Sequence, residues 1–154
     1  MEWLNVFATA FTAVTALFAA LITWWQYQLS RRQFRHELYD RRLKVFHATQ
    51  AYFADMTRRG TTGFLQCVQL RAETAEAEYL FGDEVVQLLE SLFQQGLELA
   101  GCQEQLYPEN GDQGLPKGDE RTRVANRKHE LLRKLMADDF GRTRAAFKRY
   151  LTIE

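Results

Sequence analysis

The sequence predicts an all-α protein in which one N-terminal transmembrane helix continues into a cytoplasmic four-helix bundle. Three observations lead to this fold class. Residues 3–30 contain no charged side chain and no histidine. After residue 30, apolar residues recur at separations of three, four and seven positions, which is the period of an amphipathic helix. No segment alternates between apolar and polar residues for long enough to predict a β-strand.

The first predicted element, residues 3–29, has the length and composition of a helix that crosses a bilayer. Its apolar core, residues 3–25, would reach roughly 34 Å at about 1.5 Å per residue, and a bilayer core is about 30 Å thick. Aromatic residues stand near both ends, as they do in spanning helices: Trp3, Trp24, Trp25 and Tyr27. A cleaved signal peptide would need a basic start and a shorter apolar stretch, so we expect an uncleaved anchor.

Basic residues follow this segment and predict its orientation: Arg31, Arg32, Arg35, Arg41, Arg42 and Lys44. Glu2 is the charged side chain that precedes it. The positive-inside rule therefore places the N-terminus outside the inner (cytoplasmic) membrane and residues 30–154 in the cytoplasm. We also expect the six cations to hold anionic lipid headgroups, at roughly 1 kcal/mol per charge near the surface.

Small residues occupy every fourth position along one side of the predicted transmembrane helix: Ala8, Thr12, Ala16 and Ala20. Such a row lets two helices approach closely. It predicts packing between copies of the chain and therefore a homo-oligomer. The plainer interpretation is that Ala and Thr are ordinary residues of spanning helices.

The cytoplasmic part, residues 30–154, is long enough for one compact domain and too short for two. Glycine- and proline-containing segments divide it into helices at about residues 26–59, 64–79, 84–106 and 120–151. The first of these continues from the transmembrane helix, and Gly141 inside the last allows a kink. The second helix has apolar positions at Phe64, Leu65, Val68, Ala72 and Ala75.

Charge is unevenly distributed along a chain whose formal net charge is zero. Residues 73–112 contain no Lys or Arg, whereas residues 31–59 and 117–149 are predominantly basic. This segregation predicts that acidic and basic helices pack side by side, within one chain or between subunits. Solvated helix faces are the simpler alternative. The two cysteines, Cys67 and Cys102, form no C-x-x-C pair, and a disulfide is not expected in the cytoplasm.

Motifs for nucleotide binding, nucleophilic catalysis and metal binding are not found, so no metal or cofactor is predicted. One pair of residues at the start of the last helix remains a catalytic candidate, Arg123 and His129. A cationic Arg can hold a phosphate, and a His can move a proton to or from a ribose hydroxyl. Six residues correspond to about 240° around an ideal helix after one full turn. The pair therefore needs an irregular turn or a site shared between subunits, and a basic solvated turn is the plainer interpretation.

A four-helix bundle with R-x(4–6)-H at the start of its last long helix resembles the HEPN superfamily. Here that motif is Arg123 to His129. The resemblance implies a dimeric, metal-independent ribonuclease in which these two residues are catalytic. Active sites of the superfamily usually carry a polar residue directly after the Arg, and this chain has Val124 there.

A spanning helix ahead of a divergent HEPN-like bundle resembles the membrane accessory proteins of type VI-B RNA-targeting CRISPR systems. The full length is also similar to uncharacterised small single-pass bacterial membrane proteins. The stretches that carry this similarity are Tyr39-Asp40-Arg41-Arg42, Glu78-Tyr79-Leu80-Phe81-Gly82 with Glu84, and Glu120-Arg121. The resemblance implies an oligomeric, pore-type accessory in antiviral defence.

Three functions follow from the sequence. We favour a non-enzymatic, single-pass membrane module whose cytoplasmic bundle oligomerises and perturbs the membrane or surrounds a pore. The second is a membrane-tethered HEPN-like ribonuclease that uses Arg123 and His129. The third is a scaffold that docks a cytoplasmic partner. In each case the partner, whether RNA or protein, is not identified by the sequence.

Overall fold

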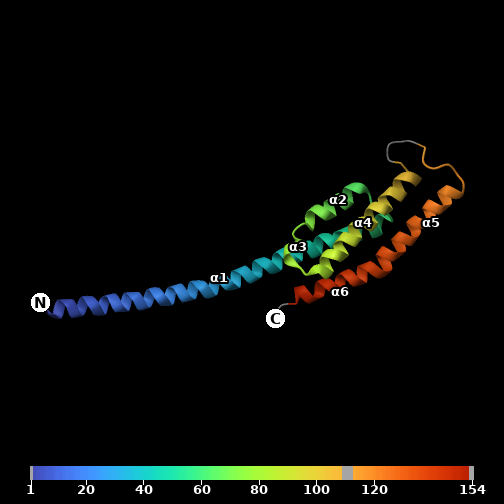
Figure 1. The fold of residues 1–154 in the computed structure, drawn as a ribbon. Coiled ribbons are helices and arrows are strands. Elements are labelled where there is room, and N and C mark those ends of the chain that lie inside the picture. Colours follow the sequence, from blue (N-terminus) through green and yellow to red (C-terminus); the bar gives the residue numbers. More distant parts are fainter. Residues whose placement is uncertain (1, 109–112, 153–154) are drawn as a thin grey trace. The chain divides into compact units, whose positions relative to one another are not determined.

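The computed structural model describes residues 2–108 and 113–152, and within these it describes side chains for residues 15–28 and from residue 35 onward. The described part contains helices joined by turns and loops and no strand, so the predicted all-α class and the helical bundle are confirmed. The helices are α1 (Glu2–Arg59), α2 (Phe64–Glu73), α3 (Ala77–Leu80), α4 (Asp83–Leu106), α5 (Asp119–Lys134), the π-helix η1 (Leu135–Asp139) and α6 (Phe140–Leu151) (Figure 1).

The chain divides into two compact units, residues 1–39 and 40–154. The first unit is the N-terminal part of α1. Its side chains at residues 15–28 are all exposed. Among the described residues, no helix has a stretch that is both long and apolar enough to span a membrane. Within the predicted transmembrane helix, residues 3–29, the side chains of residues 15–28 are described, and residues 3–14 and 29 lie outside the described side chains.

The second unit is a bundle built on one face of α1. Val45, Thr49, Phe53 and Met56 lie three or four residues apart and are almost completely buried. The rings of Phe53 and Phe140 meet edge to face at 5.2 Å, which joins α1 to α6. Helix α4 packs against α2, α3, α5 and α6, so it closes the core from the opposite side. Each buried Leu or Phe contributes about 1.5–3 kcal/mol of hydrophobic stabilisation.

The second predicted helix, residues 64–79, is divided in the structure. Helix α2 ends at Glu73, and α3 begins at Ala77. The hydroxyl of Thr74 donates to the Leu70 carbonyl at 2.8 Å, and the N–H of Ala77 donates to the Thr74 carbonyl at 2.9 Å. This second bond spans three residues and tightens the chain into a turn. The turn brings Ala77 and Leu80 into the core.

The last predicted helix, residues 120–151, contains a π-helical turn between α5 and α6. The N–H of Phe140 donates to the Leu135 carbonyl, five residues back. The irregularity therefore precedes Gly141, where the sequence allowed a kink. Buried residues recur at intervals of four: Leu131, Leu135, Asp139, Thr143 and Phe147. Each such step turns about 40° beyond a full α-helical turn. The wider π turn offsets this drift and keeps the series facing the core.

Gly96 lets α4 approach α1 and α2 closely. A Cβ at this position would meet the Tyr52 hydroxyl and lie 3.0 Å from the Cys67 sulfur. Tyr52, Cys67 and Gly96 are all buried, and the Tyr52 oxygen and the Cys67 sulfur are 3.8 Å apart. Burial is the main reason why the pKa of the Tyr52 phenol is raised. The hydroxyl therefore stays neutral and acts as a packing group.

We predict that Gly96→Ala destabilises the bundle by about 1–3 kcal/mol, because the added methyl group overpacks this contact. Gly101→Ala, on the same helix, is the matched control. Nothing lies within 4 Å of a Cβ at Gly101, so this substitution should instead stabilise by up to about 1 kcal/mol through helix propensity. Urea unfolding of both variants measures the difference. Equal stabilities would contradict the packing assigned to Gly96.

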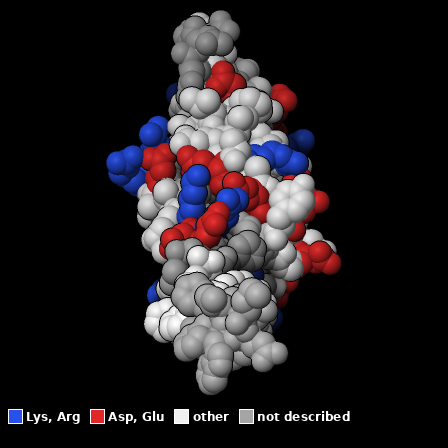
Figure 2. All heavy atoms as spheres, turned by 90° about the vertical axis from the view of Figure 1, so that its left-hand side faces the viewer, with Lys and Arg blue, Asp and Glu red and all other residues white. Residues whose placement is uncertain are grey.

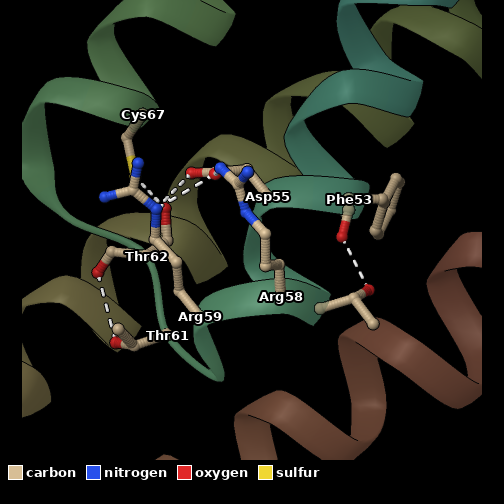
Figure 3. A network of polar contacts seen from close by, with 8 residues as sticks. Phe53, Asp55, Arg58, Arg59, Thr61, Thr62 and Cys67 are labelled. Atoms are coloured by element: carbon tan, nitrogen blue, oxygen red, sulfur yellow. Dashed lines mark hydrogen bonds and ion pairs between the residues drawn. The ribbon is translucent and has the colours of Figure 1, made fainter.

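Helix α1 ends in a compact charged cluster of Asp55, Arg58 and Arg59 (Figure 3). A glycine in the left-handed conformation follows it. Arg58 Nη2 donates to Asp55 Oδ1 at 2.6 Å, and Arg59 Nε lies 3.0 Å from the same carboxylate. Gly60 follows with φ of 63° and donates its N–H to the Met56 carbonyl at 2.8 Å. Glycine tolerates this conformation without strain, so it ends the helix.

The hydrogen bond from Arg58, with further help from Arg59, lowers the pKa of the Asp55 carboxyl below its ordinary value. We predict that Arg58→Gln raises this pKa toward the ordinary value. NMR titration of the Asp55 carboxyl carbon measures the change. Because the folded-state pKa is depressed, the stabilisation from this cluster is present above the unfolded pKa and is lost as pH falls through the folded pKa. An Asp55 pKa that is unchanged in the variant would contradict this assignment.

Candidate functional site

The most unusual surface of the described chain is the apolar segment of α1 in the first unit. Between residues 15 and 28, seven large apolar side chains are exposed: Leu17, Phe18, Leu21, Ile22, Trp24, Trp25 and Tyr27. Trp25 retains 75% of its accessible surface. The Thr23 hydroxyl donates to the Ala19 carbonyl at 2.8 Å, so this polar side chain is satisfied by its own helix. The seven large side chains cover about 220° around the helix. An apolar surface this broad is typical of a segment covered by lipid or by other apolar helices.

The row of small residues predicted to pack between copies is described only in part. Ala16 and Ala20 are exposed. Ala8 and Thr12 lie outside the described side chains. The packing role of the row stays a prediction.

The six predicted headgroup cations differ in their surroundings. Arg31 and Arg32 lie outside the described side chains, and Arg35 and Lys44 are exposed. Arg41 forms an ion pair with Glu76 at 3.7 Å. Arg42 is half-buried, and its side chain contacts other helices of the bundle.

Arg42 ties α1 to two other parts of the bundle. Its Nε donates to the Leu80 carbonyl at 3.0 Å, and its guanidinium carbon lies 5.7 Å from the centre of the Tyr150 ring. The Tyr150 hydroxyl accepts the N–H of Gly82 at 3.2 Å, and its ring meets Phe81 edge to face at 5.3 Å. The corner formed by these five residues joins α1, the α3–α4 turn and α6. The sequence showed Arg42 and residues 80–82 only as separate stretches, since pairs this distant leave no local signal.

We predict that Arg42→Lys destabilises the bundle by about 1–2 kcal/mol. Lysine keeps the charge, but it lacks the planar guanidinium that donates to the Leu80 carbonyl and lies over the Tyr150 ring at the same time. Arg41→Lys is the matched control, because an exposed ion pair tolerates this exchange at a cost within about 1 kcal/mol. Thermal unfolding followed by circular dichroism compares the two. The same loss in both variants would show that charge alone matters at this corner.

Acidic and basic helices pair within the chain. Arg127 on α5 contacts Glu98 on α4 at 2.6 Å, and Arg149 on α6 contacts Glu84 on α4 at 2.9 Å. The hydrogen bonds that Arg127 donates to Glu98 and, secondarily, to Glu130 raise the pKa of Arg127, which stays charged. Figure 2 shows acidic and basic side chains next to one another on one face of the molecule. Side-by-side packing inside one chain, one of the two predicted forms, therefore accounts for part of the charge segregation.

The two residues of the predicted catalytic pair lie on one regular helix. Arg123 and His129 are both exposed on α5, which is helical from Asp119 to Lys134. The His129 Nδ1 is hydrogen-bonded to the Ala125 carbonyl at 2.8 Å, one turn back on its own helix. The irregular turn that the pair would need in one chain lies at η1, beyond His129. A site shared between subunits stays a prediction.

A buried polar cluster was missed by sequence reasoning. Gln95 Nε2 donates to Asp139 Oδ2 at 3.1 Å and to Ser91 Oγ at 2.8 Å. Gln95 and Asp139 are buried, as is Thr143. Gln95 Oε1 and Thr143 Oγ1 have no hydrogen-bond partner in the described part of the chain. The π turn brings Asp139 inward, so only the tertiary structure reveals this contact between α4 and the end of η1.

In the described ranges, no group of three or more His, Cys, Asp or Glu side chains is placed to hold a metal ion. Cys67 and Cys102 are free thiols, and burial raises the pKa of Cys102. An open groove of about 630 Å³ between α1 and α6 is lined by Phe46, Arg144, Lys148 and Leu151, among others. These residues offer two cations and apolar contacts.

Comparison with protein-family models, curated proteins and solved structures gave no match to this chain.

Proposed function

We propose that the protein is a non-enzymatic membrane module with two parts. Residues 3–29 anchor it as a single-pass helix in the inner (cytoplasmic) membrane, and the bundle of residues 40–154 self-associates in the cytoplasm. One observation carries the proposal: the large apolar side chains between residues 15 and 28 are exposed, within a segment from 3 to 30 that has no charge.

The exposed apolar surface of this helix is too large to remain in contact with water. Apolar surface costs about 25 cal/mol per Å² when left in water, and the largest apolar patch on a typical monomer is about 300–600 Å². Seven large side chains distributed around a single helix exceed that range. Acyl chains cover such a helix on every side, which favours a membrane over a one-sided protein partner.

The cations that follow the segment support the proposed orientation. Arg35 and Lys44 are exposed and suited to anionic headgroups, whereas Arg42 contributes to the fold. Asymmetry of this kind retains the basic side of an anchor in the cytoplasm. A membrane-perturbing or pore-type accessory in antiviral defence is the specific form implied by the resemblance to type VI-B accessory proteins.

The residues argue for a structural role rather than catalysis. Arg123 and His129 are exposed and separated on a regular helix, and His129 is bonded to its own backbone. An active site requires its groups within hydrogen-bond reach of one substrate. A ribonuclease would therefore need a second subunit to complete the site, and cleavage that survives His129→Ala would exclude that alternative.

Membrane fractionation of the full chain tests the anchor. We predict that the wild-type protein stays in the membrane pellet after an alkaline carbonate wash. The double variant Leu17→Arg/Leu21→Arg should move to the supernatant, because each Arg near the centre of a spanning helix costs about 2.5–3.5 kcal/mol. The matched control Gln26→Arg/Gln28→Arg adds the same charge at the cytoplasmic end and should stay in the pellet. Wild-type protein in the supernatant would overturn the proposed anchor.

A further inference from the structure

Helix α2 has two apolar faces, and only one of them is used inside the bundle. Cys67 and Leu70 point into the core. On the other side, Phe64 is 68% exposed, Leu65 is 72% exposed and Val68 is 42% exposed. Ala72 is also exposed. These four residues, here called the α2 face, lie within about 100° of one another around the helix.

The α2 face concentrates the apolar surface of the second unit. In the described part of that unit, five large apolar side chains are exposed: Phe64, Leu65, Val68, Tyr79 and Tyr107. Three of them belong to the α2 face. The patch amounts to roughly 300 Å², the size at which exposed apolar surface on a monomer is often functional.

We infer that the α2 face binds the α2 face of a second copy of this chain, with the two helices antiparallel about a two-fold axis. The inference deepens the proposed function, since it rests on the proposed self-association and names the surface responsible. Two properties of α2 point to this occupant and to this direction. They are the taper of its side chains and the distribution of charge along it.

The side chains of the α2 face decrease in size along the helix. Phe64 and Leu65 stand at its start, and Ala72 stands near its end, followed by the exposed Ala75. In an antiparallel pair the large side chains of one copy lie over the small ones of the other. Alternation of large and small residues across facing positions is what close packing requires. A parallel pair would instead place Phe64 against Phe64 and leave a gap at Ala72.

The charges around the α2 face also change along the helix, from basic at its start to acidic at its end. Arg58 and Arg59 lie beside the turn that leads into α2 (Figure 3), and Arg59 lines the same groove as Gln66 of that helix. Acidic residues gather at the other end: Glu73, Glu76 and Glu78. The first cluster keeps a net charge of +1 after Asp55. Arg71, in the last turn of α2, is paired with Glu90, so the second cluster keeps a net charge of −2 after Arg41.

An antiparallel pair sets each basic end against the partner's acidic end, twice per dimer. Complementary charges of this kind fix the direction of a self-interaction more than its strength. A parallel pair would bring the three acidic residues of both copies together, and like charges at that distance repel. Both the packing and the electrostatics therefore favour the antiparallel arrangement.

The size of the patch sets the strength of the interaction. Stable interfaces bury about 1,200–2,000 Å² in total, more than two α2 faces supply. The interaction is therefore weak between free copies and is raised by confinement of both anchors to one membrane, which increases their effective concentration. Self-association through the α2 face thus depends on the anchor.

The first experiment measures the mass of the full-length protein in detergent by light scattering. We expect the wild type to dimerise as its concentration in the detergent phase rises, because the anchors are then confined together. Leu65→Asp/Val68→Asp should weaken dimerisation on the order of tenfold or more, because two carboxylates would be buried in an apolar contact. The control Gln87→Asp/Gln105→Asp adds the same charge at exposed positions of α4 and should leave the mass unchanged. Circular dichroism checks that each variant is folded.

The second experiment tests the direction by disulfide trapping. Leu65→Cys/Ala72→Cys should give covalent dimers, whereas Leu65→Cys alone should not. Positions 65 and 72 of one copy are about 10 Å apart along the helix, too far for an internal disulfide. Dimers from Leu65→Cys alone would overturn the antiparallel arrangement. The native thiols Cys67 and Cys102 are buried, and the wild type run in parallel controls for them.

The outcomes separate this inference from the proposed function. If Leu65→Asp/Val68→Asp stays dimeric and in the membrane pellet, the α2 face is not the interface and the proposed anchor stands. If that variant keeps its mass but loses binding to anionic lipid vesicles, the face contacts lipid and the inference falls. If the wild type is monomeric in detergent and on vesicles, both the inference and the proposed self-association fall.

Discussion

The buried face of α1 between Val45 and Met56 is the surface on which the rest of the second unit depends. Phe53 meets α6 through Phe140, and Tyr52 meets α2 through Cys67. Arg42, about three turns before Phe53, holds the turn between α3 and α4. A single helix face therefore sets the positions of the other helices. Close packing along it explains why Gly96 must lack a side chain.

The proposed functions of the two units follow from which apolar side chains each unit buries and which it leaves exposed. The second unit buries most of its large apolar side chains and pairs the acids of α4 with the bases of α5 and α6. The segment at residues 15–28 exposes them over more than half of the helix circumference, and α2 exposes one of its two apolar faces. Surfaces that a fold leaves uncovered are those available to a bilayer or to a second copy.

Local signals were sufficient for much of the fold. Gly60 to Gly63 marked the end of α1, and the helix expected at residues 84–106 begins at Asp83 and ends at Leu106. Local signals failed where contacts between distant parts of the chain change the shape of a helix whose sequence has a regular apolar period. The apolar period from 120 to 151 predicts one helix. The π turn at residues 135–139 arises because buried residues four apart must keep facing α1 and α4.

The sequence by itself determined that this protein is helical, where its turns fall, and that an uncharged apolar segment precedes a charged bundle, since each of these depends on neighbouring residues. It also showed Phe64, Leu65 and Val68 as apolar positions of one helix. Which of the two apolar faces of α2 turns inward was decided by the space that Tyr52 and Gly96 leave for Cys67. The contacts of Arg42 with Leu80 and Tyr150, and of Gln95 with Asp139, were likewise decided only in three dimensions. Pairs so far apart in sequence meet through packing of whole helices, which no local pattern encodes.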